Sequence, residues 1–272
     1  LMTIERTLLL IDHHADDQPL YIEDGVLHRR KMGDEGQRHL ASRVSRFLRE
    51  AQINQRKFFE TSHLNLLPRI INQLSSPRDQ LDKERLLNRL MALQVKSDRI
   101  RNAALFSDDS EIVSLIEFIQ NSNEMSDDAL QVSDSYIKLS EGQLDRLIPL
   151  AERIEAFEEI MADFFVGKSV KVSSRFGLDI KTATGKLSET DLSSGEYHFL
   201  YMMVSALLCQ RRGTVLAIDE PELSLHVSWQ RKLVSALTRC ASGAAPLFFF
   251  STHSTTISAN HAFAVQSLSP ID

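Results

Sequence analysis

The sequence predicts an α/β fold in which a parallel sheet with crossover helices is interrupted by a large all-helical insertion. From Asp191 onward, apolar strand segments alternate with helical segments, which favours parallel strands joined by helices. Between Gly36 and about Phe165, apolar residues instead recur at helical spacing. We therefore expect three parts: strand-rich residues 1–35, a helical insertion over residues 36–166, and the C-terminal part of the core over residues 167–272.

Composition sets broad limits on the class of protein. The hydrophobic content of 43% and the charged content of 25% are ordinary for a globular chain. The formal net charge of -6 gives no whole-chain sign of nucleic-acid binding, but a local basic patch would leave nucleic acid open as a partner. No apolar run approaches the roughly 18 residues of a membrane span, and no signal peptide is recognisable. We expect a cytoplasmic protein that does not enter the membrane, with Cys209 and Cys240 as buried thiols.

The N-terminal part and the insertion have distinct patterns. Thr7–Ile11 is a short apolar run typical of a strand, and Asp24-Gly25 is a hairpin turn signal before a second apolar segment. In the insertion, helical spacing is clearest at Leu40, Val44, Phe47 and Leu48, and at Leu86, Leu90 and Leu93. The last helix carries apolar residues from Leu147 to Phe164 at steps of three and four, which favours an amphipathic helix over a coiled coil because the pattern covers under three heptads.

Strand and helix then alternate to the end of the chain. We expect strands over 170–172, 178–181, 215–218 and 247–251, and helices over 194–210 and 226–239. The strands of the parallel sheet should be buried on both faces, as the unbroken apolar run at 247–250 suggests. Functional groups should then lie at the carboxyl ends of the strands.

The segment that opens the helix at 194 has two explanations. Ser193 with Glu196 three residues later forms a capping box, which many helices use without any further role. The same helix start offers backbone N–H groups and a positive dipole end to a phosphate, and Gly195 would let the phosphate approach the backbone. The sequence alone leaves both explanations open.

Two predicted strands end in residues that suit phosphate and metal chemistry. Asp219 and Glu220 follow an apolar strand and precede Pro221, and His253 follows the next strand between two hydroxyl residues. The structural alternatives are solvated acids at a strand end, and a histidine satisfied by the neighbouring hydroxyls. Functionally, Asp219 would hold Mg²⁺ through water.

In this order, the three segments resemble the C-terminal half of an ABC-type ATPase core, with its signature motif, Walker B motif with adjacent glutamate, and switch histidine. The resemblance implies that the chain binds ATP and Mg²⁺, that Glu220 orients and deprotonates the attacking water, and that His253 contacts the γ-phosphate. It also implies self-association, because the signature motif binds ATP held by the opposite subunit. The residues implied in that contact are Ser193, Ser194, Gly195 and Glu196, with Ser194 replacing the usual first glycine.

Such a core needs a phosphate loop, and Gly167-Lys168-Ser169 has the residue types of one. Its context is unsuitable, because Ala162 stands where the first glycine should be, a helix precedes the triplet and a strand follows it. Gly167 is better explained as the stop signal of the long helix. We expect the phosphate loop to lie upstream of Leu1 or on another chain.

The segment Asp219–His226 resembles the branch of overcoming-lysogenization-defect nucleases and bacterial defence ATPases. His226 is equally well explained as an ordinary helix-start residue. The resemblance leans toward anti-phage ATPases of the Septu or retron-associated type and implies a nucleotide-gated switch that controls an effector such as an HNH nuclease. The alternatives are a DNA-repair or chromosome-maintenance ATPase and a non-hydrolysing scaffold with the same fold.

Overall fold

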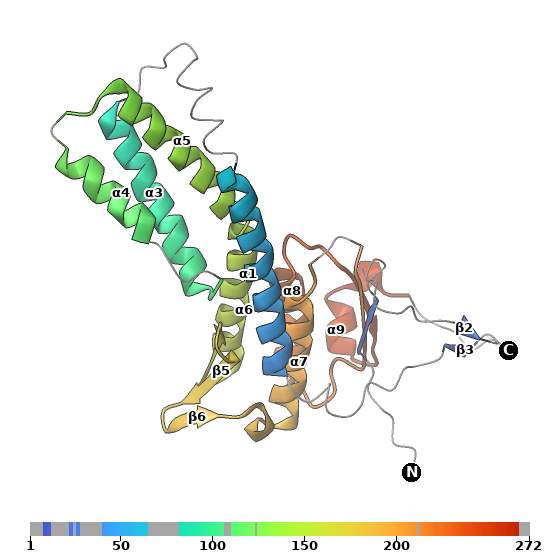
Figure 1. The fold of residues 1–272 in the computed structure, drawn as a ribbon. Helices are drawn as coiled ribbons and strands as arrows, with labels where there is room; N and C mark the ends of the chain where they lie inside the picture. The colour runs from blue at the N-terminus through green and yellow to red at the C-terminus, as the bar shows by residue number, and fades with distance from the viewer. Residues whose placement is uncertain are drawn as a thin grey trace. The chain divides into compact units, whose positions relative to one another are not determined.

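The computed structural model of the chain describes residues 8–11, 22–23, 26–27, 40–64, 82–105, 110–122, 124–210 and 213–266. Backbone contacts divide the chain into two compact units, whose α-helices are labelled in Figure 1. The core unit comprises Leu1–Val44, Ala156–Lys171 and Leu178–Asp272, and the helical unit comprises Ser45–Glu155 and Val172–Gly177. Most of residues 1–35 fall outside the described residues, so the three-part organisation stays a prediction.

The N-terminal strands agree with the sequence pattern. Strand β1 covers Leu8–Ile11, and the short strands β2 (Ile22–Glu23) and β3 (Val26–Leu27) pair antiparallel, with Ile22 opposite Leu27. This pairing confirms the hairpin that the Asp24-Gly25 signal predicts.

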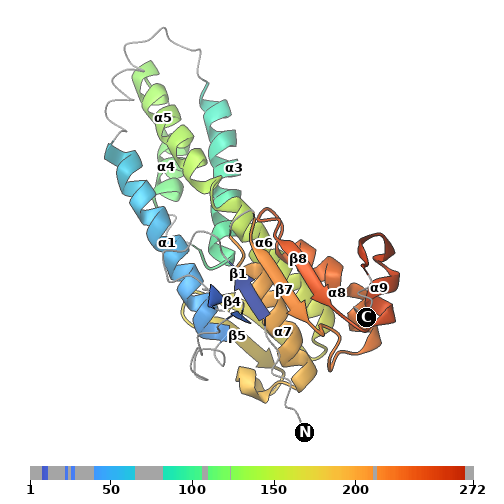
Figure 2. The same cartoon turned by 90° about the vertical axis from the view of Figure 1, so that its right-hand side faces the viewer.

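The main sheet of the core unit has the order β1-β7-β8, which Figure 2 shows from its face. Strands β7 (Val215–Asp219) and β8 (Leu247–Ser251) run parallel, and β1 lies antiparallel on the other side of β7. Helix α8 (Val227–Cys240) connects the parallel pair, as a crossover connection requires. The mixed α/β fold with parallel strands and a crossover helix is thus confirmed.

The expectation that the parallel strands are buried on both faces is wrong. Leu216 and Ile218 of β7 are buried, whereas Leu247 and Phe249 of β8 are each 56% exposed. Alternate side chains of a strand point to opposite faces, so the in-register pairing of β7 with β8 gathers the exposed residues on one face. Among the described residues, only the opposite face of the sheet, which carries Leu216 and Ile218, is covered by other side chains.

An aromatic cluster joins three helices of the core unit. The ring of Phe164, at the end of α6 (Ile148–Phe164), stacks on Phe199 of α7 (Ser194–Leu207) with centroids 4.2 Å apart. The indole of Trp229 in α8 lies 5.2 Å from Phe199 and 5.9 Å from Phe165. These contacts confirm that the last helix of the insertion packs on its neighbours as an amphipathic helix, and they hold α7 against α8 at Phe199.

The remaining described elements after α6 are short. Strands β5 and β6 pair antiparallel in a second sheet of order β4-β5-β6. The bounds are Lys168–Ser173 for β4, Gly177–Thr182 for β5, Gly185–Leu187 for β6, Glu189–Asp191 for the 3-10 helix η1, Thr255–Ala259 for α9 and Ala262–Ala264 for η2. Cys209 and Cys240 are buried free thiols, as predicted.

The helical unit is built from α3 (Lys83–Asn102), α4 (Ser110–Asn121), α5 (Asp127–Leu144), most of α1 (Leu40–Leu64) and the first part of α6. The residues that predicted these helices are buried: Leu40, Val44, Phe47 and Leu48 in α1, and Leu86, Leu90 and Leu93 in α3. Within the described ranges, no helix combines the length and the apolar character needed to cross a membrane.

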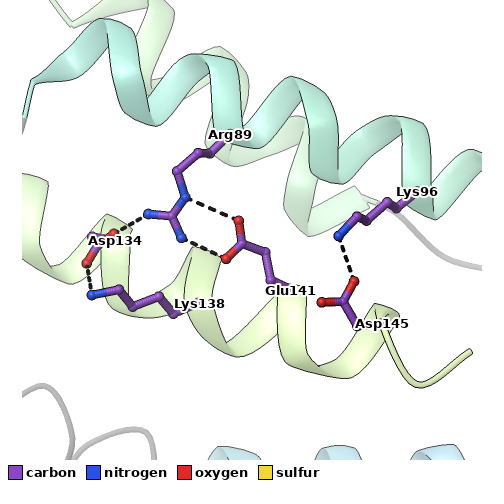
Figure 3. A network of polar contacts seen from close by, with 6 residues as sticks. All are labelled: Arg89, Lys96, Asp134, Lys138, Glu141 and Asp145. Atoms are coloured by element: carbon purple, nitrogen blue, oxygen red, sulfur yellow. Dashed lines mark hydrogen bonds and ion pairs between the residues drawn. The ribbon is translucent and has the colours of Figure 1, made fainter. Parts of the chain in front are cut away.

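Helices α3 and α5 are also joined by a polar network (Figure 3). The guanidinium of Arg89 donates to both oxygens of Glu141, at 3.2 and 2.7 Å, and pairs with Asp134, whose side chain is only 3% exposed. Lys138 holds the other oxygen of Asp134 at 2.8 Å. Because Asp134 is buried, its charge depends on these two cations.

We expect Arg89→Met to destabilise the protein by about 2 kcal/mol, because the change keeps the aliphatic stem but removes charge-assisted hydrogen bonds to a buried carboxylate. Lys96→Met is the matched control. Its pair with Asp145 joins the same two helices at 2.6 Å, but the side chains are 40% and 57% exposed, so its loss should cost less than about 0.5 kcal/mol. Denaturant unfolding of both variants measures the difference, and equal losses would contradict the importance of the buried carboxylate.

Candidate active site

The carboxyl ends of β7 and β8 bring three predicted site residues to one edge of the sheet. Asp219 pairs with Ser251 in the register, and the Glu220 N–H donates to the Ser251 carbonyl at 2.8 Å. His253 follows two residues beyond Ser251 at the same edge. Parallel strands with this register bring the residues that follow them to one edge of the sheet. Asp219, Glu220 and His253 therefore lie at the same edge, although they come from separate strand ends.

The side chains of these residues are available to a ligand. Asp219 and His253 are exposed and Glu220 is half-buried. Within the described part of the chain, neither carboxylate forms an ion pair or hydrogen bond, and the His253 ring has no hydrogen-bond partner. The two hydroxyls beside His253 are engaged elsewhere, since Thr252 donates to Glu222 and Ser254 donates to Gln230. The alternative in which these hydroxyls satisfy the histidine is therefore wrong.

Among the described residues, no group of three or more histidine, cysteine, aspartate or glutamate side chains forms a metal-binding cluster. Asp219 fits the other mode of magnesium binding. Mg²⁺ keeps most of its water and takes one or two carboxylates together with substrate phosphates, and Asp219 offers one exposed, unpaired carboxylate.

The loop between β7 and α8 has a fixed, partly strained conformation. Glu220 and Ser224 have φ angles of 45° and 63°, in the left-handed region that non-glycine residues rarely adopt. The Leu223 N–H donates to the Glu220 carbonyl at 3.0 Å, and the Leu225 N–H donates to the Glu222 carbonyl at 2.9 Å. Such strain persists where surrounding contacts hold the backbone and is frequent at functional sites.

The segment Ser193–Glu196, called the signature segment after the motif that it resembles, forms the capping box that its sequence predicts. The Ser193 hydroxyl accepts from the Glu196 N–H at 3.3 Å, and the Glu196 carboxylate accepts from the Ser193 N–H at 2.9 Å. Ser193 and Ser194 are exposed, whereas Gly195 is buried. The helix start is thus well ordered, and two of its four predicted residues face solvent.

The structure gives a reason for a glycine at position 195 that the sequence did not reveal. A Cβ atom built at this position would overlap the carbonyl oxygen of Ser224, in the loop after β7. The absence of a side chain therefore lets the signature helix and this loop touch through their backbones. This contact links the signature segment with the loop that begins at Glu220.

The triplet Gly167-Lys168-Ser169 lies between a helix and a strand, as its sequence context predicts. Helix α6 ends at Phe164, Gly167 has a φ of 74°, and β4 begins at Lys168. The helix stop is confirmed, and no helix begins at this described triplet to present N–H groups to a phosphate. The Lys168 ammonium instead pairs with the Glu196 carboxylate, with side chains only 22% and 16% exposed.

This ion pair affects the titration of Glu196. Burial raises the pKa of its carboxyl, but hydrogen bonds from Lys168 and from Ser193 outweigh burial, and the net pKa lies below the ordinary value. A carboxyl with a depressed pKa in the folded state adds stability above its unfolded pKa of about 4.3, and this contribution is lost as the pH falls through the lower folded value.

We expect Lys168→Ala to lower the free energy of unfolding by about 1 kcal/mol at pH 7, because it removes a charge-assisted hydrogen bond. The difference from the wild type should shrink as the pH falls below the unfolded pKa of about 4.3, and it should vanish once Glu196 is protonated in the folded state as well. Arg239→Ala is the control, since its pair with Glu159 is 52% and 63% exposed and should contribute less than about 0.5 kcal/mol.

Lys168→Ala should also leave ATP affinity unchanged. Because we find no suitable phosphate loop in the sequence, residues 1–272 alone should bind ATP weakly or not at all. Micromolar binding to these residues by calorimetry, abolished by Lys168→Ala, would show that Gly167-Lys168-Ser169 does hold phosphate.

The structure also explains His226, for which the sequence left two explanations open. His226 is the N-cap of α8, where its Nδ1 accepts from the Ser228 N–H at 3.3 Å. The helix-start explanation of His226 is therefore confirmed, and its place in a family motif stays a prediction.

One protein family matches most of this chain. The family described as "AAA domain, putative AbiEii toxin, Type IV TA system" matches residues 38–259. The chain belongs to this family. The matched range includes every predicted site residue of this AAA domain and the whole of the helical unit. No curated relative matches the chain.

Among solved structures, this AAA domain is similar to the crystal structure of an Smc head domain with an extended coiled coil, bound to the C-terminal domain of ScpA, from Pyrococcus furiosus. The sequence identity is 14% and the TM-score is 0.34. The similarity covers 85% of this chain and 54% of the Smc chain, so the AAA domain spans about half the length of that chain.

Proposed function

We propose that this AAA domain hydrolyses ATP as one subunit of an ABC-type assembly. The observation that carries the proposal is the joining of Asp219, Glu220 and His253 at one edge of the parallel strands, with side chains open to a ligand.

Each of the three residues has a role that its chemistry suits. Asp219 would hold Mg²⁺, which when bound neutralises charge on the phosphates of ATP. Glu220, next in the chain and half-buried, would orient the attacking water and accept its proton. His253, whose ring has no hydrogen-bond partner among the described residues, would contact the γ-phosphate. The phosphate loop would come from a segment upstream of Leu1 or from another chain.

The signature segment would complete the site of an opposite subunit. Its helix start combines backbone N–H groups, the positive end of the α7 dipole and exposed Ser193 and Ser194, which together suit an anionic phosphate. Glu196 lowers the local positive potential, but Lys168 balances its charge. ATP would therefore hold two copies of the chain together, as an ATP-dependent dimer or a higher assembly.

We further propose that the assembly is a nucleotide-gated switch for a separate effector, such as an HNH nuclease in anti-phage defence. The motif Asp219–His226 leans toward that branch, and the helical unit is a large, mostly helical region that could bind another protein. Closure of two cores around ATP would displace the two helical units as rigid bodies, and this displacement would hold or release the effector.

The test is a pull-down of the effector with and without ATP. Deleting most of residues 45–155, in a variant that still folds, should abolish effector binding, whereas Ser193→Ala should spare binding but remove its dependence on ATP. Ser188→Ala is the matched control, because Ser188 caps η1 in the same way and lies outside the signature segment. Binding without the helical unit would contradict the switch, and so would purified chain that cleaves DNA unaided.

A further inference from the structure

The carboxylate of Glu222 holds the start of the loop after β8. Its Oε1 accepts from the His253 backbone N–H at 2.8 Å, and its Oε2 accepts from the Thr252 hydroxyl at 2.7 Å. Both oxygens of one side chain are thus directed at two successive residues of a different loop. Hydrogen bonds to an ionised carboxylate are about twice as strong as bonds between neutral groups.

A second contact fixes the same two loops. The Gln230 amide donates to the Leu225 carbonyl at 3.0 Å, and its oxygen accepts from the Ser254 hydroxyl at 2.8 Å. Ser254 in turn caps α9, and its N–H donates to the Thr252 hydroxyl at 3.0 Å. The backbone on both sides of His253 is therefore tied to the loop that follows β7.

These contacts link both proposed reactive residues, Glu220 and His253, to the loop that follows β7. Glu220 begins the loop after β7, and Glu222 lies two residues later in the same loop. Because the His253 ring has no hydrogen-bond partner of its own among the described residues, its position depends on the backbone to which it is attached. Glu222 holds that backbone at the His253 N–H.

We propose that Glu222 is a positioning residue that sets His253 relative to Glu220 for ATP hydrolysis. This proposal rests on the proposed function, since it assigns Glu222 to the same site. Glu222 does not touch ATP or the attacking water in this proposal. It acts through His253, so that the residue contacting the γ-phosphate and the residue activating the water keep a fixed separation.

The experiment compares Glu222→Ala, Glu222→Gln, His253→Ala and the double variant Glu222→Ala/His253→Ala in the active assembly, with the phosphate loop present. Glu222→Ala should lower kcat about 10- to 100-fold, the effect of a misplacement near 1 Å, with little change in KM. Glu222→Gln should recover most of the loss, because its amide oxygen still accepts from the His253 N–H. The double variant should be no slower than His253→Ala, since Glu222 acts through that residue.

Glu159→Ala is the control, because Glu159 is an exposed residue of α6 away from the strand ends. Hydrogen exchange at the His253 amide gives a readout without turnover, and it should be protected in the wild type and at least 10-fold faster in Glu222→Ala. Full activity in Glu222→Ala, or additive losses in the double variant, would overturn the role of Glu222, while an inactive Glu220→Gln variant would leave the ATPase assignment intact. Equal rates in the wild type and Glu220→Gln would instead overturn the proposed function and this proposal with it.

Discussion

Replacing Glu220 with glutamine is expected to lower ATP turnover by about 100-fold or more while leaving ATP binding intact. The change keeps the size and hydrogen-bonding shape of the side chain but removes its ability to accept a proton, and loss of a general base typically costs 100- to 10,000-fold. Because Asp219 is unchanged, Mg²⁺ and ATP should still bind. The ATP-bound closed assembly should therefore accumulate, which size-exclusion chromatography with and without ATP can measure.

The matched control is Glu159→Gln, which makes the same chemical change on an exposed part of α6. Its turnover should equal that of the wild type. Undiminished hydrolysis by Glu220→Gln, in a preparation free of other ATPases, would refute the assignment of Glu220 as the base.

Local sequence signals predicted most elements of the core because the relevant physics acts over a few residues. The capping box of Ser193 with Glu196 starts α7 one residue after the cap, and Gly167 stops α6 before β4. The apolar run at 247–250 correctly predicted β8, but it could not reveal that one face is open. Burial of a strand depends on what packs against it, and this information is not contained in the strand itself.

The same distinction applies to the candidate site. Asp219, Glu220 and His253 could be grouped from the sequence because groups at the ends of parallel strands meet at one edge. The bonds from Thr252 and His253 to Glu222 could not, since they join residues 30 and 31 positions apart through a loop with left-handed backbone at Glu220 and Ser224. The pairing of Lys168 with Glu196 spans 28 positions and was equally hidden.

The contact between Gly195 and Ser224 leads to a second large expected effect, on both stability and turnover. Gly195→Ala should destabilise the protein by about 1–3 kcal/mol, the range of an overpacked site, because the new methyl group would overlap a backbone carbonyl that has no rotamer to escape into. Gly142→Ala is the matched control. Gly142 also lies in a helix, α5, but nothing lies within 4 Å of the added Cβ, so the change should stabilise by up to about 1 kcal/mol.

The two explanations of Gly195 predict different outcomes for this pair of variants. If the glycine only lets a phosphate approach the helix start, Gly195→Ala should be as stable as Gly142→Ala and should lose only ATP-dependent association. If the Ser224 contact determines the glycine, stability should fall and the displaced loop should shift Glu220, lowering turnover about 100-fold even where ATP still binds. Denaturant unfolding separates the two cases before any assay of turnover. A Gly195→Ala variant more stable than the wild type would show that the Ser224 carbonyl does not lie against this helix in solution.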